Sequence, residues 1–116
     1  MIIGIGLDIV ELHRIRRLDN RSSKFRERIL TERELTEYAG LSDKRKVEFL
    51  AGRFAAKEAF AKANGTGIGE MCSFADIEIQ KDEKGKPSIY FRQQEIGFVS
   101  ITHTKEYAAA QVVLQS

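Results

Sequence analysis

The sequence predicts an α+β protein, with helices in the first half of the chain and a mostly antiparallel sheet in the second. The length of 116 residues is that of one domain. Helix-type spacing with capping residues runs from about residue 11 to 64, and strand-like segments separated by turn residues fill residues 75–114. Hydrophobic residues make up 42% and charged residues 31%, a globular balance. We therefore expect residues 1–116 to form a single domain.

The chain opens with a segment that predicts a strand. Residues 2–10 are rich in Ile, Leu and Val and hold no polar residue before Asp8, which indicates a buried or nearly buried strand. In a strand, Gly4, Gly6 and Asp8 point to the same face. The carboxylate therefore lies beside two positions without side chains, where another group can approach the backbone closely.

Two further features of the sequence indicate a cytoplasmic protein. The first residues lack the basic n-region of a secretory signal, and Asp8 comes too early for a membrane span. Cys72 is the only cysteine, which excludes an intrachain disulfide and a thiolate zinc site and suits a reducing compartment. We expect no membrane attachment.

Three helices are expected after the first strand. Their limits follow from capping and stop signals: an Arg-rich stretch from about residue 11 to 30, interrupted near 19–23; a second helix from the Thr31–Glu34 capping box to Gly40; and a longer third helix from the Ser42 cap to Asn64 and Gly65. The third helix is long enough to organise the domain.

Short strands are expected in the rest of the chain. The alternating segment 75–81 and the segment 88–92 predict a hairpin around the polar turn DEKGKP. Two more strands are expected at VSITH, residues 99–103, and YAAAQVVL, residues 107–114, joined by a short polar link. This order of elements predicts a mostly antiparallel sheet.

Positive charge is concentrated early in the chain. Between His13 and Arg28, seven Lys or Arg stand against two acids, a local net charge of +5 in a chain of net charge +2. Such a field attracts acidic partners over roughly 8 Å at physiological salt. A nucleic acid, an anionic membrane and an acidic protein all fit this charge, and a merely solvated helix face is the alternative.

The third helix directs a carboxylate, Glu58, toward the core. It falls within an apolar stripe on the helical wheel. The stripe consists of Val47, Leu50, Ala51, Phe54 and Ala61. A carboxylate there is costly unless it is paired, hydrogen-bonded or bound to a metal. One explanation is an ion pair with Lys62 at i+4. The other is a meeting with Asp8, because two carboxylates completed by water and phosphate are typical of a Mg²⁺ site.

Cations and hydroxyl groups supply candidates for phosphate binding. The third helix carries Lys44, Arg45 and Lys46 at its start and Arg53, Lys57 and Lys62 on or beside the Glu58 flank. The late strand adds Ser100, Thr102, His103 and Thr104, which fit either a phosphate site or an ordinary polar strand end. The loop GTGIG, residues 65–69, follows a helix rather than preceding one. Its default role is a C-cap and turn, and close substrate approach is the alternative.

Three ordered motifs resemble the bacterial holo-acyl-carrier-protein synthases, the small trimeric type of the 4′-phosphopantetheinyl transferase family. They are GIGLDIVEL at 4–12, FLAGRFAAKEAFAKANGTGIG at 49–69 and VSITHTKEYAAAQVVL at 99–114. The resemblance implies that family's α+β fold and the transfer of 4′-phosphopantetheine from coenzyme A to a serine of apo-acyl carrier protein, releasing adenosine 3′,5′-bisphosphate. It also implies Mg²⁺, a homotrimer with active sites between subunits, and a role in fatty acid biosynthesis.

The resemblance assigns roles to residues of this chain. It implies metal binding and catalysis by Asp8 and Glu58, with Lys62 on the reacting pyrophosphate. The residues implied to bind coenzyme A are Lys44, Arg45, Arg53, Lys62, Gly65, Gly85, Pro87, His103 and Thr104, with the turn 85–87 approaching the adenine from a neighbouring subunit. The residues implied to contact an acidic helix of the carrier protein are Arg14, Arg21, Lys24, Phe25 and Arg28.

Some alternatives stay open from the sequence. The base that takes the serine proton is Glu58 itself or a metal-bound water. A nucleic-acid-binding module is disfavoured, because the basic segment has little aromatic interleaving beyond Phe25 and no recognised motif. A metal-dependent phosphohydrolase is disfavoured because two carboxylates are few for a two-metal site. We therefore expect a carrier protein and coenzyme A as partners and no nucleic acid.

Overall fold

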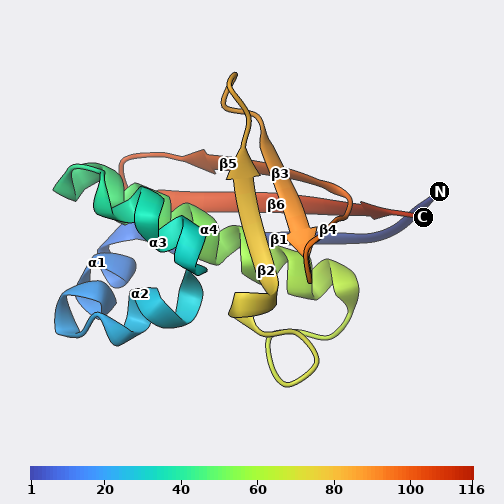
Figure 1. Cartoon of the computed structure of the whole chain (residues 1–116), viewed down its shortest axis with the longest axis horizontal. Coiled ribbons are helices and arrows are strands. Elements are labelled where there is room, and N and C mark those ends of the chain that lie inside the picture. Colours follow the sequence, from blue (N-terminus) through green and yellow to red (C-terminus); the bar gives the residue numbers. More distant parts are fainter.

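The computed structural model describes residues 1–116 and combines four α-helices with two three-stranded antiparallel sheets (Figure 1). The elements are β1 (Ile2–Glu11), α1 (Leu12–Arg21), α2 (Lys24–Ile29), α3 (Glu32–Ala39), α4 (Asp43–Asn64), the 3₁₀ helix η1 (Phe74–Asp76), β2 (Ile77–Lys81), β3 (Pro87–Phe91), β4 (Gln94–Glu95), β5 (Phe98–His103) and β6 (Tyr107–Gln115). The α+β class is confirmed. No helix combines the length and apolar character that a membrane span requires.

The helix count differs from the three predicted. The Arg-rich stretch forms two helices, α1 and α2, because Ser22 adopts an extended backbone conformation at the expected interruption. The capping box of Thr31 and Glu34 opens α3, and the Ser42 side chain caps α4. Gly65 ends α4 in the left-handed conformation at φ 82°, which confirms the C-cap expected for the glycine-rich loop.

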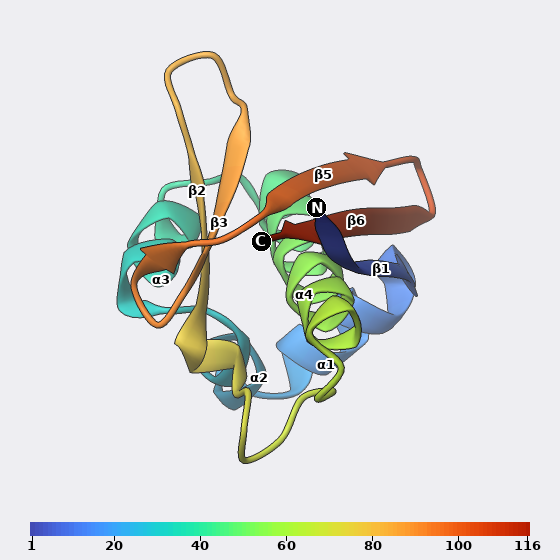
Figure 2. The same ribbon diagram turned by 90° about the vertical axis from the view of Figure 1, so that its right-hand side faces the viewer.

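Helix α4 packs against the inner face of the sheet with strand order β1-β6-β5 (Figure 2). A Cβ added at Gly4 would lie 2.2 Å from the carbonyl oxygen of Ala63, and one at Gly6 would lie 1.8 Å from that of Ala59. The close approach expected at these glycines is therefore made by the backbone of α4 itself. It brings the C-terminal half of α4 directly against β1, beside Asp8.

The prediction that residues 2–10 form a buried strand is wrong for the single chain. Only the glycine face of β1 is covered. The side chains on the other face are exposed: Ile3 61%, Ile5 60%, Leu7 61% and Ile9 65%. A strand that is apolar on both faces is normally covered on both, so this exposed face of β1 is suited to pack against a second surface.

The second sheet has the order β2-β3-β4, and its β2–β3 hairpin crosses the direction of β1 and β6 (Figure 1). The hairpin and its polar turn are confirmed, with Gly85 at φ 84°. The short strand β4 was not predicted. It follows a turn in which Arg92 and Gln93 both have positive φ, a conformation for which their residue types give no signal.

Candidate active site

Asp8, Glu58 and Lys62 come together where α4 crosses β1. Lys62 Nζ lies 3.1 Å from Asp8 Oδ1 and donates a second hydrogen bond of 3.0 Å to the carbonyl oxygen of Leu7. No ion pair within 4.0 Å joins Lys62 to Glu58. The intrahelical pair considered from the sequence is therefore wrong, and Lys62 reaches across to the strand instead.

Glu58 lies in an environment that disfavours its charge. Its pKa is raised above 4.5 first by burial and then by the negative charge of Asp8. The charges of Lys62, Arg28 and Arg14 act in the opposite direction and do not outweigh these two causes. Glu58 is thus a carboxylate close to the charge of Asp8, and a cation bound between the two would stabilise both.

The residues present fit a hard divalent cation such as Mg²⁺. No group of three His, Cys, Asp or Glu side chains gathers anywhere in the structure. The protein therefore offers two oxygen ligands, Asp8 and Glu58, and leaves the other positions to water and to a ligand's phosphate oxygens, as is usual for Mg²⁺. The bound ion would supply charge neutralisation at those phosphate oxygens.

Residues predicted to contact a carrier protein lie around this carboxylate pair. Arg14 of α1 and Arg28 of α2 are near enough to act on the charge of Glu58. Arg21 and Lys24 are exposed. Phe25 is only partly available, because it is half-buried with its ring centroid 6.1 Å from that of Phe54. The basic surface thus borders the candidate metal site.

The residues predicted to bind coenzyme A phosphates gather at the other end of α4. One pocket of about 190 Å³ is lined by Arg45, Arg53, Gly85, Pro87 and His103, with Glu48, Phe49, Gly52, Lys81 and Ile101. A second, of about 380 Å³, is lined by Lys44, His103 and Thr104, with Leu12, Arg16, Val47, Glu48 and Lys105. The turn around Gly85 therefore meets α4 of the same chain. Gly65 lies apart from both pockets, at the C-cap of α4.

Two of these predicted residues are held by the protein itself. Arg53 is only 2% exposed, and burial lowers its pKa despite Glu34 at 3.7 Å and Glu37 at 3.8 Å. Its Nε and Nη2 atoms have no hydrogen-bond partner, although the residue lines the smaller pocket. The Thr104 hydroxyl accepts hydrogen bonds from the backbone N–H groups of Glu106 and Tyr107 and so shapes the turn before β6.

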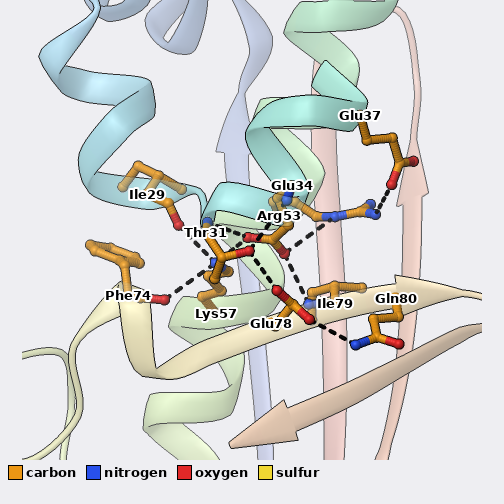
Figure 3. A network of polar contacts seen from close by, with 10 residues as sticks. All are labelled: Ile29, Thr31, Glu34, Glu37, Arg53, Lys57, Phe74, Glu78, Ile79 and Gln80. Atoms are coloured by element: carbon orange, nitrogen blue, oxygen red, sulfur yellow. Dashed lines mark hydrogen bonds and ion pairs between the residues drawn. The ribbon is translucent and has the colours of Figure 1, made fainter. Parts of the chain in front are cut away.

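The sequence-based placement of Lys57 on or beside the Glu58 flank is wrong. The Lys57 side chain is fully buried and turned toward α2, α3 and η1 (Figure 3). Sequence reasoning also missed Lys81, which lines the smaller pocket and whose pKa is lowered by burial and by Arg53. It missed Glu48, which lies 3.5 Å from Arg45 Nε and 3.7 Å from His103 Nδ1. No pattern links these residues, because they meet only through the packing of the hairpin on α4.

The carboxylate pair and the cationic pockets are far apart on one chain. Glu58 lies about 20 Å along α4 from Arg45, since an α-helix rises about 1.5 Å per residue. Arg53, which lines the smaller pocket with Arg45, lies about 8 Å along the same helix from Glu58.

Comparison with known proteins identifies the class to which this chain and its fold belong. A model of the 4′-phosphopantetheinyl transferase superfamily matches residues 4–112. The chain therefore belongs to the 4′-phosphopantetheinyl transferase superfamily.

Within that superfamily, the chain is similar to proteins named holo-[acyl-carrier-protein] synthase. It is 64% identical to the Bacillus subtilis protein, over 99% of this chain and 97% of that one. It is 61% identical to the Geobacillus kaustophilus protein, over 99% of this chain and 90% of the relative.

Solved structures give the same result. A crystal structure of the Bacillus anthracis holo-(acyl-carrier-protein) synthase in complex with CoA (3′,5′-ADP) matches with a TM-score of 0.93 and 54% identity, covering 100% of this chain and 98% of that chain. The structure from Neisseria meningitidis matches with a TM-score of 0.90 and 40% identity, with all of both chains covered. The fold implied by the resemblance is confirmed.

Proposed function

We propose that this protein transfers the 4′-phosphopantetheine group of coenzyme A to a serine of apo-acyl carrier protein, giving holo-acyl carrier protein and adenosine 3′,5′-bisphosphate. The pairing of Asp8 with Glu58 beside Lys62 carries the proposal, because it provides oxygen ligands and a cation for a pyrophosphate. The named synthases that share up to 64% identity with the chain support it. Coenzyme A in the Bacillus anthracis relative supports the choice of donor.

Magnesium dependence is part of this proposal. Asp8 and Glu58 would hold the ion, whose chemistry is to neutralise charge on the pyrophosphate during attack. The pKa of Glu58 is raised first by burial and second by the charge of Asp8, and a divalent cation bound to both carboxylates would offset this second cause. Protein stability gives a readout that does not depend on turnover. We expect Mg²⁺ to raise the Tm of the protein, and this rise to be absent in Glu58→Gln.

The other steps fall to side chains of this chain. The serine Oγ forms a bond to the β-phosphorus, the bond from that phosphorus to the bridging oxygen breaks, and the nucleotide departs with that oxygen. The base that accepts the Oγ proton is Glu58 itself or a water that it holds, and in the absence of the ion burial and the charge of Asp8 raise the pKa of Glu58. Lys62 is about half exposed and can turn from Asp8 to the departing phosphate.

We propose that the functional unit is a homotrimer with active sites between subunits. The exposed side chains of Ile3, Ile5, Leu7 and Ile9 form a contact surface on β1. The separation of about 20 Å between Arg45 and Glu58 along one helix also favours it, because one subunit would then supply the carboxylates and its neighbour the nucleotide pocket. In this arrangement Arg45, Arg53, Lys81, Gly85, Pro87 and His103 face the nucleotide.

The basic surface of α1 and α2 is the proposed docking site for the carrier protein. Arg14, Arg21, Lys24 and Arg28 would contact an acidic helix of the partner, and Phe25 would add a small apolar contact. This geometry delivers the acceptor serine next to Glu58. We propose a cytoplasmic enzyme that serves fatty acid biosynthesis.

The decisive experiment is intact-mass analysis of apo-acyl carrier protein incubated with this protein, coenzyme A and Mg²⁺. We expect a mass gain equal to one phosphopantetheine group, abolished by a chelator and restored by added Mg²⁺. The same mixture without carrier protein tests for hydrolysis of coenzyme A, which would indicate a phosphohydrolase. No mass gain with several carrier proteins would overturn the proposal.

A further inference from the structure

Lys57 is a buried cation next to Glu58 in the sequence, yet it faces away from the carboxylate site. Its side chain is 0% exposed. Nζ donates hydrogen bonds to the carbonyl oxygen of Ile29 at 2.7 Å, to Glu34 Oε1 at 2.6 Å and to the carbonyl oxygen of Phe74 at 3.2 Å (Figure 3). An ammonium group has three hydrogens, so every donor is used. No donor remains for a ligand, and the role of Lys57 is internal.

The three acceptors belong to three separate segments. Ile29 is the last residue of α2, Glu34 lies in the first turn of α3, and Phe74 begins η1. The Glu34 carboxylate is itself held by the backbone N–H groups of Thr31 and Ile79, at 2.9 Å each. Lys57 therefore ties α2 and η1 to α4 at the level of Glu58.

Both carbonyl contacts of Lys57 lie next to Arg28. Arg28 directly precedes Ile29, and its Cζ stands 5.5 Å from the ring centroid of Phe74. Arg28 also belongs to the charges that act on Glu58. The residues that Lys57 fixes are thus the ones against which the Arg28 side chain is placed.

Stability alone does not account for this arrangement. A buried ion pair gives little or no advantage over apolar side chains of similar volume, since the desolvation of both charges offsets their attraction. What three directed hydrogen bonds add is a fixed relative position of the segments they join. We infer that Lys57 is a positioning residue, which holds α2 so that Arg28 stands beside the Asp8–Glu58 pair and faces the incoming carrier protein. The inference rests on the proposed transfer reaction.

A double-mutant cycle tests whether Lys57 acts through Arg28. Lys57→Met and Glu34→Gln are introduced together, so that neither member of this pair is left charged without the other, while Arg53 keeps Glu37 at 3.8 Å; circular dichroism checks the fold. The value of kcat/KM for apo-acyl carrier protein is then measured with and without Arg28→Gln. We expect the paired change to lower it about tenfold alone, but less than about twofold when Arg28 is already replaced. The KM for coenzyme A should change less than kcat/KM for the carrier protein, because Arg53 loses Glu34 but keeps Glu37.

Two further variants serve as a control and as a replacement for the paired change. Glu78→Gln removes one charge from the same network but touches neither α2 nor η1, since Glu78 accepts hydrogen bonds only from Thr31 and Gln80. It should lower kcat/KM by less than about twofold in either background. If the paired variant unfolds, Lys57→Gln combined with Glu34→Gln, in which the new amide at 57 keeps two donors, replaces it in the cycle.

The outcomes separate the two proposals. Equal losses with and without Arg28 would mean that Lys57 only supports the fold, and would overturn the positioning role. Absence of transfer by the unaltered protein would instead overturn the proposed function.

Discussion

Lys62 Nζ lies 3.1 Å from Asp8 Oδ1, on the neighbouring strand, rather than beside Glu58 one turn earlier on its own helix. The cation therefore offsets the charge of Asp8 and leaves Glu58 the carboxylate with the raised pKa. The two carboxylates that would hold the ion thus differ in environment, since Asp8 has a cation within 4.0 Å and Glu58 has none.

Replacing Asp8 should abolish transfer without unfolding the protein. In Asp8→Ala, kcat should fall about 100-fold or more, because a charge that organises the transition state is lost. The partly exposed pair with Lys62 contributes only about 0–1 kcal/mol to stability. Turnover by intact mass and urea unfolding measure the two effects. Glu11→Ala, an exposed acid at the end of the same strand, is the control, and an Asp8→Ala enzyme as active as this control would refute the proposed metal site.

Removing the charge of Glu58 should stabilise the metal-free protein. A carboxyl group whose pKa is higher in the folded than in the unfolded chain adds stability that is fully present below about pH 4.5 and is lost as pH rises through the folded pKa. With chelator present, Glu58→Gln should therefore gain stability over the original protein between pH 4 and pH 7, by urea unfolding. Glu95→Gln, at an exposed position of β4, should show no such gain. A gain confined to low pH would contradict the sign.

Lys81 should contribute to coenzyme A binding. Lys81→Ala is expected to raise the KM for coenzyme A about tenfold with a smaller change in kcat, because one cation leaves a pocket that also holds Arg45 and Arg53. Lys84→Ala, in the adjoining turn but outside that pocket, is the matched control. Equal KM values for the two variants would remove Lys81 from the site.

The apolar face of β1 should hold subunits together. Ile5→Lys removes burial worth about 2 kcal/mol per contact and adds a charge to that face. We expect light scattering to show a shift from trimer to monomer, with transfer activity lost in parallel. Gln94→Lys introduces the same charge on the exposed strand β4 and should leave both unchanged. A monomeric Ile5→Lys protein with full activity would refute a site shared between subunits.

The contact between β1 and α4 should tolerate no side chain at Gly6. A methyl group there would meet the Ala59 carbonyl oxygen, a backbone atom that cannot turn aside. Gly6→Ala should therefore cost about 3 kcal/mol in the free energy of unfolding. Gly69→Ala has open space around the added carbon and should cost little. Similar Tm values for the two variants would contradict the close packing described.

The sequence predicted those parts of the site that follow from local periodicity. Asp8 was found because strand alternation sets it beside Gly4 and Gly6, and Glu58 because a carboxylate interrupts an apolar helix stripe. Capping residues likewise gave the limits of α3 and α4. These patterns depend only on residues close together in the sequence, so the predictions based on them do not require knowledge of tertiary contacts.

The parts that were missed depend on contacts between distant segments. Lys57 was predicted on or beside the Glu58 flank as a candidate for phosphate binding, but its ammonium group donates to Ile29, Glu34 and Phe74 in the core. The apolar character of β1 was visible, but hydropathy does not tell whether the cover comes from the same chain or another. In the same way, the pocket that Lys81 lines forms only because the β2–β3 hairpin packs beside α4.

The two faces of strand β1 have different roles, so the register of its alternating side chains matters for function. Since successive residues alternate between faces, inserting or deleting one residue ahead of Asp8 would turn the carboxylate to the outside and push a branched side chain against α4. The proposed metal ligand, the helix contact and the apolar surface would all be lost together. Length at this strand is thus constrained more tightly than the identity of most residues within it.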